Sequence, residues 1–127
     1  MGDLETEMQQ VFYEAYSNTI TQVDILFQPH HGRKSGTVPD NLLKVLNPKL
    51  IIIGNAPAEH INYGNSRQTI TQDTAGDIMF ENDGNEVHVY TKNKINNRPT
   101  CLICKTGKSN VKFANQGILY YVGTLIL

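Results

Sequence analysis

Cysteine is scarce in this sequence, whose 127 residues include only Cys101 and Cys104. Two thiolates are too few for a four-ligand structural zinc site, and no second Cys-x-x-Cys pair is present to complete one. A thioredoxin-type redox dithiol begins a helix after a strand, whereas this pair lies in an apolar, β-prone run. We therefore expect two structural thiols, which alternation along a strand would direct to opposite faces.

Long apolar runs are also missing. No segment approaches the roughly 20 consecutive apolar residues of a membrane-spanning helix, so we expect no membrane partner. Residues 1–5 are acidic where a signal peptide would be basic. With 39% hydrophobic and 18% charged residues, the composition suits one globular domain with a modest core. We expect a cytoplasmic protein, or a piece of a longer one.

Acidic residues are absent from residues 87–127, which contain six basic side chains, whereas residues 1–86 contain twelve acidic and five basic ones. The formal charges of these two parts are therefore +6 and −7, although the net charge of the chain is only −1. One interpretation of the basic part is an ordinary solvated surface. The other is attraction to a phosphate-bearing substrate, nucleic acid included.

Hydrophobic periodicity predicts an α/β fold that begins with a helix and a βαβ unit. The apolar residues of segment 4–17 recur with helical spacing, and Asp3 stands where an N-cap would lie. Apolar runs at 23–28 and 50–54 predict two strands, with a helix at 39–46 between them. Strands joined by such a crossover are parallel, so their carboxyl ends meet at one edge of the sheet.

Three histidines and a tyrosine fall at that predicted edge. His30 and His31 directly follow the first strand, and the loop after the second strand, residues 55–65, carries His60 and Tyr63. Imidazole binds zinc, iron or manganese and titrates near neutral pH, so the His-His pair indicates a candidate metal or catalytic site. His60 is equally well interpreted as a solvent-facing loop residue.

The second half of the chain indicates antiparallel strands. Alternating runs at 77–81 and 86–90 flank an Asp-Gly turn, which is a strong hairpin pattern. Segments 100–104 and 117–127 are expected to add two further strands. Alternation places His88 on the opposite face from its valine neighbours, where we expect a surface residue.

The order of these motifs resembles a known family. Segments 2–4 (Gly-Asp-Leu), 29–32 (Pro-His-His-Gly), 62–64 (Asn-Tyr-Gly) and 73–77 (Asp-Thr-Ala-Gly-Asp) are similar to the carboxyl half of the metallo-β-lactamase fold, in the branch related to the competence protein ComEC. The resemblance covers residues 2–91 and leaves residues 92–127 as a basic, β-rich extension. It implies half of an αββα sandwich.

The resemblance also implies roles for the residues at the sheet edge. Asp3 would bridge two metal ions, zinc or else manganese or iron, and His31 would bind one of them. His30 would support that ligand or contact substrate, although either histidine can take either role. His60 and Tyr63 would polarise a small-molecule ester or phosphodiester substrate.

Two departures from the family pattern limit this interpretation. Segment 63–66 reads Tyr-Gly-Asn-Ser where the branch has Tyr-Gly-His-Pro, and the family's His-x-His-x-Asp-His motif is absent. Two ligands are fewer than the three or so that a catalytic zinc ion needs. The first hypothesis is therefore part of a metal-dependent hydrolase, incomplete or inactive as this chain alone. The alternative is a non-catalytic half-fold that associates with itself or with a partner chain.

Overall fold

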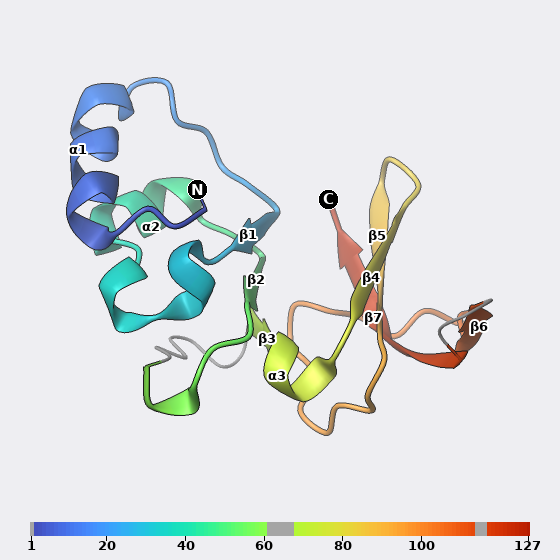
Figure 1. The fold of residues 1–127 in the computed structure, drawn as a ribbon. Coiled ribbons are helices and arrows are strands. Elements are labelled where there is room, and N and C mark those ends of the chain that lie inside the picture. Colours follow the sequence, from blue (N-terminus) through green and yellow to red (C-terminus); the bar gives the residue numbers. More distant parts are fainter. Residues whose placement is uncertain (1, 61–67, 114–116) are drawn as a thin grey trace.

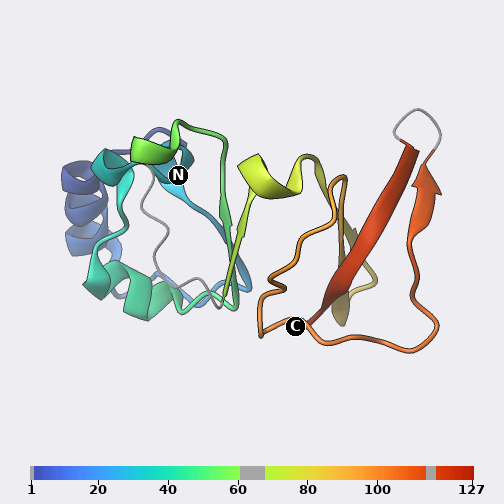
Figure 2. The same ribbon diagram turned by 90° about the horizontal axis from the view of Figure 1, so that it is seen from below.

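The computed structural model describes residues 2–60, 68–113 and 117–127 and shows an α/β fold, as the sequence predicts (Figure 1). Helices α1 (Thr6–Tyr16) and α2 (Asp40–Leu46) lie on one side of a three-stranded parallel sheet, and a four-stranded antiparallel sheet lies on the other (Figure 2). None of the described helices has the length and apolar character needed to cross a membrane.

The parallel sheet has the order β1-β2-β3, with β1 at Ile25–Phe27, β2 at Leu50–Ile53 and β3 at Thr69–Thr71. Helix α2 lies between β1 and β2 in the sequence, and these two strands pair in parallel, which confirms the predicted βαβ unit. Helix α2 ends where Asn47 adopts a left-handed conformation, with φ 39°. Strand β3 was not predicted; it pairs in parallel with β2.

Strand β2 is buried along its whole length because its two faces contact two different cores. Leu50 and Ile52 belong to the core shared with the antiparallel sheet, and Ile51 and Ile53 belong to the core beneath the helices. Successive side chains of a strand point to opposite faces, so a continuous apolar run suits this position. The chain therefore covers both faces of the parallel sheet itself, with the helices on one face and the antiparallel sheet on the other.

The antiparallel sheet has the order β4-β5-β7-β6. Strands β4 (Ile78–Asn82) and β5 (Glu86–Thr91) form the predicted hairpin, and β7 (Gly117–Ile126) forms the predicted last strand. The short strand β6 (Val111–Phe113) pairs with β7 and was not predicted.

Two predictions for this half of the chain are wrong. Segment 100–104 is not a strand, because Ile103 alone forms a bridge, with Thr124. His88 is not a surface residue: only 4% of it is exposed, because the side chain of Thr124 on β7 and the turn before β5 lie against it.

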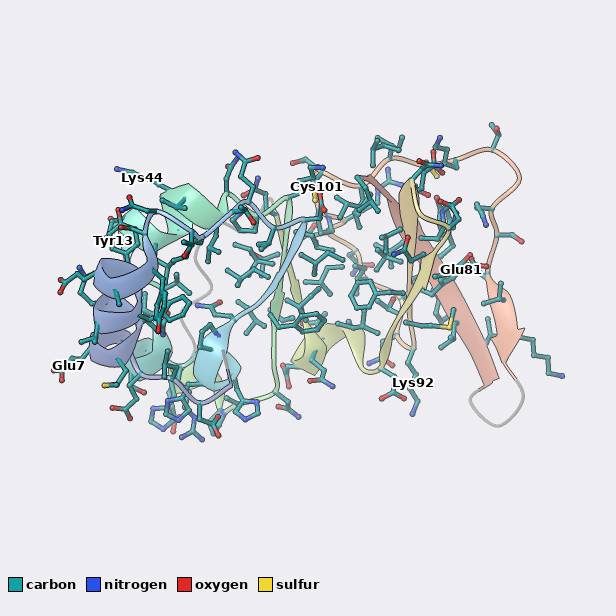
Figure 3. The ribbon with its side chains drawn as sticks, turned by 90° about the horizontal axis from the view of Figure 1, so that it is seen from above. Glu7, Tyr13, Lys44, Glu81, Lys92 and Cys101 are labelled. Carbon is teal, nitrogen blue, oxygen red and sulfur yellow. The ribbon has the colours of Figure 1, made fainter. Side chains whose placement is uncertain are left out.

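Helix α1 confirms the predicted helix but places its apolar stripe outward. Met8, Val11 and Tyr16 are each more than half exposed, whereas Gln9 is completely buried. Glu7 also lies on the outer side of this helix (Figure 3). The helix begins after an N-cap at Glu5, whose side chain forms no capping bond, so the expected N-cap role of Asp3 is wrong.

Candidate metal centre

The turn after β1 holds both histidines of the pair in an uncommon backbone conformation. Residues Pro29–Gly32 form the 3₁₀ segment η1, in which His30 and His31 have φ values of 51° and 56°, followed by Gly32 at 78°. Residues other than glycine rarely adopt positive φ, because the Cβ atom approaches the backbone oxygen too closely. Such strain persists only where the surrounding structure fixes it, and it is concentrated at functional sites.

Two glycines make room for this turn. A Cβ atom at Gly36, at the end of the segment η2 (Lys34–Gly36), would lie 2.5 Å from the Cβ atom of His30. A Cβ atom at Gly54, which directly follows β2, would lie 2.9 Å from Nδ1 of His31. Both histidines therefore pack directly against glycine backbone, and a larger residue at either position would displace them.

Hydrogen bonds tie the amino-terminal segment to this turn. The backbone N–H of His30 donates to the carbonyl of Gly2 over 2.8 Å. The buried amide of Gln9 donates to the carbonyls of Leu4 and Gly36, over 2.8 and 3.0 Å. These bonds join the residues on both sides of Asp3 to the loop that carries the histidines.

As a result, Asp3 and His31 lie side by side. Their nearest polar atoms, Oδ1 and Nε2, are 4.0 Å apart, and both side chains are more than half exposed. Asp3, the candidate residue before α1, therefore lies close to His31, the candidate residue after β1.

Asp3 and His31 line one pocket, which has a volume of about 340 Å³. The pocket lies between the carboxyl edge of the parallel sheet and strand β4. Phe27 and Phe80 form an apolar wall, with their rings edge to face and their centroids 6.0 Å apart. The remaining lining residues are Gly2, Gln28, Ile52, Gly54, Gln72 and Ile78.

The other predicted site residues lie elsewhere. His30 directs Nδ1 toward the hydroxyl of Ser35, 3.0 Å away, and it is not among the residues that line the pocket. His60 lies in the exposed segment η3 (Ala58–His60), with Nε2 3.5 Å from Oε1 of Glu59, and it does not line the pocket either. Tyr63 lies outside the described residues.

Sequence reasoning missed two pocket residues, Gln28 and Gln72. Gln28 stands between β1 and the His-His turn, so its position at the sheet edge was available as a signal. Gln72 opens helix α3 (Gln72–Ala75) directly after β3, and no pattern in the sequence had indicated that strand.

The basic side chains of the extension are less available to attract phosphate than the sequence indicates. Lys92, Lys105 and Lys108 each form an ion pair with a carboxylate of the β4–β5 region, at Asp77, Glu86 and Glu81 respectively. Half of the six basic side chains after residue 86 are thereby neutralised locally, which reduces the field available to attract phosphate.

The two thiols differ in environment. Cys101 is partly buried and packs against the core between the sheets, and burial raises its pKa (Figure 3). Cys104 is exposed, and neither thiol forms a disulfide. The side chain of Cys101 therefore fills space in the core, as expected of a structural thiol.

A second set of metal-ligating side chains lies on the antiparallel sheet. Asp83, Glu86 and His88 bring one donor atom each to within 4.8 Å of one another.

Comparisons with protein-family models, with curated proteins and with solved structures found no match to this chain.

Proposed function

We propose that this chain supplies part of the active site of a metal-dependent hydrolase of the metallo-β-lactamase kind, which cleaves an ester or phosphodiester bond. The observation that supports this best is the meeting of Asp3 and His31 at one pocket, 4.0 Å apart and held by a strained turn. Both side chains are more than half exposed, so their donor atoms are open to an ion.

The donor set fits a transition metal in part. One carboxylate and one imidazole suit zinc, manganese or iron. Two donors of a tetrahedral ion lie roughly 3.3 Å apart, so the exposed Asp3 side chain would have to move toward His31, from 4.0 Å, for one ion to be held by both. A catalytic ion needs about three protein ligands, so the remaining donors come from outside this pair, in a longer protein or a partner chain. When bound, such an ion lowers the pKa of a water molecule toward 7 and so supplies the nucleophile.

The pocket supplies the groups that hold a substrate. The side-chain amides of Gln28 and Gln72 can donate hydrogen bonds to a carbonyl or phosphoryl oxygen, and Phe27 and Phe80 offer an apolar wall to the rest of a substrate. His30 supports the turn through Ser35. His60 and Tyr63 follow β2 in sequence, and their proposed role is to contact and polarise the substrate in the complete enzyme.

Zn²⁺ titration of the whole chain by calorimetry tests the proposal. All proteins carry Asp83→Asn, which removes one ligand of the second donor set. Asp3→Asn and His31→Gln should each weaken binding by about tenfold or more, because an ion with few ligands depends on every one. Glu59→Gln is the matched control, since it removes another exposed carboxylate beside a histidine.

Binding that is equally strong in the parent, in Asp3→Asn and in His31→Gln would refute the proposed site. Turnover of a phosphodiester or ester by the chain alone should be absent or very slow. Fast turnover that survives both substitutions would place the chemistry elsewhere.

The alternative function, association without catalysis, is favoured by a different observation. The stripe of α1 formed by Met8, Val11, Phe12 and Tyr16 is exposed, and apolar surface of this kind marks contact sites. Sedimentation should show concentration-dependent association that Val11→Glu weakens and that Glu14→Gln on the same helix leaves unchanged. A monomer at high concentration would contradict self-association.

A further inference from the structure

Three side chains of the β4–β5 hairpin converge without any role in the proposed hydrolase. Asp83 belongs to the turn, Glu86 begins β5, and His88 lies two residues further along the same face of β5. Their donor atoms lie within 4.8 Å of one another. The side chain of His88 is only 5% exposed, whereas Asp83 is about half exposed and keeps the group open to solvent.

Hydrogen bonds from neighbouring residues fix the orientation of the His88 ring. Its Nδ1 lies 2.8 Å from the hydroxyl of Thr124, which lies 2.7 Å from the hydroxyl of Tyr121. The Tyr121 hydroxyl also accepts a hydrogen bond from the N–H of Lys105 over 3.2 Å. This chain of short contacts holds the His88 ring in one orientation whichever way its protons point.

The other ring nitrogen, Nε2, faces the carboxylate of Asp83. Its nearest partner is Oδ2 of Asp83 at 3.8 Å, which is too far for a hydrogen bond. The other oxygen of Asp83, Oδ1, accepts the backbone N–H groups of Asn85 and Glu86, at 3.0 and 2.9 Å. A ring nitrogen and a carboxylate oxygen thus face each other without a direct hydrogen bond, at a separation that a metal ion between them can bridge.

We propose that Asp83, Glu86 and His88 form a binding site for a divalent transition-metal ion such as Zn²⁺. An imidazole with two carboxylates favours zinc, cobalt or nickel over magnesium or calcium. A metal-ligating histidine characteristically donates its other ring N–H to a fixed acceptor, and the Thr124 hydroxyl lies 2.8 Å from Nδ1, in place to accept it. The site does not depend on the proposed hydrolase function.

Lys105 competes with the metal for Glu86. Its Nζ lies 2.5 Å from Oε1 of Glu86, and its side chain is 38% exposed. The ammonium group can therefore move into solvent when a metal ion takes its place. This competition predicts an effect that a purely structural ion pair does not produce: removing the ammonium strengthens metal binding.

Titration of the whole chain with Zn²⁺ alone, and with Co²⁺ followed by absorption, tests the site. An Asp3→Asn, His31→Gln background removes the other candidate donors, so a failure here is distinct from a failure of the proposed function. We expect one ion per chain. Asp83→Asn should weaken binding by about tenfold or more, yet it keeps the turn, because an asparagine oxygen accepts the same two backbone hydrogen bonds.

Two further variants make the outcome decisive. Lys105→Gln should strengthen binding by up to about fivefold, the scale of a partly exposed ion pair. Asp77→Asn, which removes another lysine-paired carboxylate of the same sheet, should leave it unchanged. Absence of binding in the background protein would overturn the site. An affinity for the metal that neither Asp83→Asn nor Lys105→Gln changes would also overturn the site.

Discussion

Replacing His31 by glycine and by alanine separates the strain of the His-His turn from its chemistry. Both substitutions remove the imidazole and its 4.0 Å approach to Asp3, so both should abolish metal binding at that pocket. They differ in the backbone, because His31 has a φ of 56°. A left-handed conformation costs an L-residue about 1–2 kcal/mol, and glycine loses about 0.5–1 kcal/mol through its greater freedom when unfolded. His31→Gly should therefore be more stable than His31→Ala by about 0.5–1 kcal/mol.

Urea unfolding followed by circular dichroism measures this difference. Val11, exposed in the middle of α1, is the matched control position. There, glycine should be less stable than alanine by about 1 kcal/mol, the usual difference in a helix. The sign of the glycine–alanine difference should thus reverse between the two positions.

If His31→Ala is as stable as His31→Gly or more stable, the turn carries no left-handed strain and the predicted difference is wrong. If either variant binds Zn²⁺ at the Asp3 pocket as strongly as the parent does, His31 is not a ligand there. The first result concerns the backbone alone, and the second concerns the proposed ligand.

Three further predictions concern the surroundings of the sites. Gln9→Leu should lower the free energy of unfolding by about 1–3 kcal/mol, because two carbonyl groups lose their donor, and urea unfolding measures the loss; an unchanged midpoint would contradict it. Burial, followed by the charge of Glu81, raises the pKa of Tyr90, so the folded state holds the proton more tightly and stability should fall above about pH 10. Tyr90→Phe should flatten that alkaline decrease in pH-dependent unfolding, and an unaltered slope would count against it. Iodoacetamide should label Cys104 before Cys101 by mass spectrometry, and equal rates would show that Cys101 is not protected.

Much of the fold follows from local patterns in the sequence. The apolar run at β2 predicted a strand covered on both faces, and the Asp-Gly turn predicted the β4–β5 hairpin. Strand β3 escaped prediction because three residues, two of them threonine, show no period that distinguishes a strand from a loop. It is a strand because the edge of β2 supplies its hydrogen-bond partners.

Burial of polar residues was harder to predict. Gln9 is polar, yet it is the buried residue of α1, because its amide donates to the carbonyl groups of Leu4 and Gly36. His88 alternates with two core valines as predicted, but the face it occupies is covered by Thr124 and by the hairpin turn. In both cases the decisive partner lies 27 or more residues away in sequence, and no local pattern contains it.

Helix α1 offers the strongest physical argument that the amino-terminal segment serves a site. A helix normally gains most of its stability by burying an apolar stripe, but α1 leaves that stripe in solvent and is attached instead through Gln9 and Thr6 to the loop that carries the histidines. Tyr13 of α1 also packs against the core beneath the helices, and the hydrogen bonds hold the segment around Asp3 against the loop that carries His31. A partner that covers the stripe is compatible with the proposed metal site, because the stripe and the Asp3–His31 pair use different side chains.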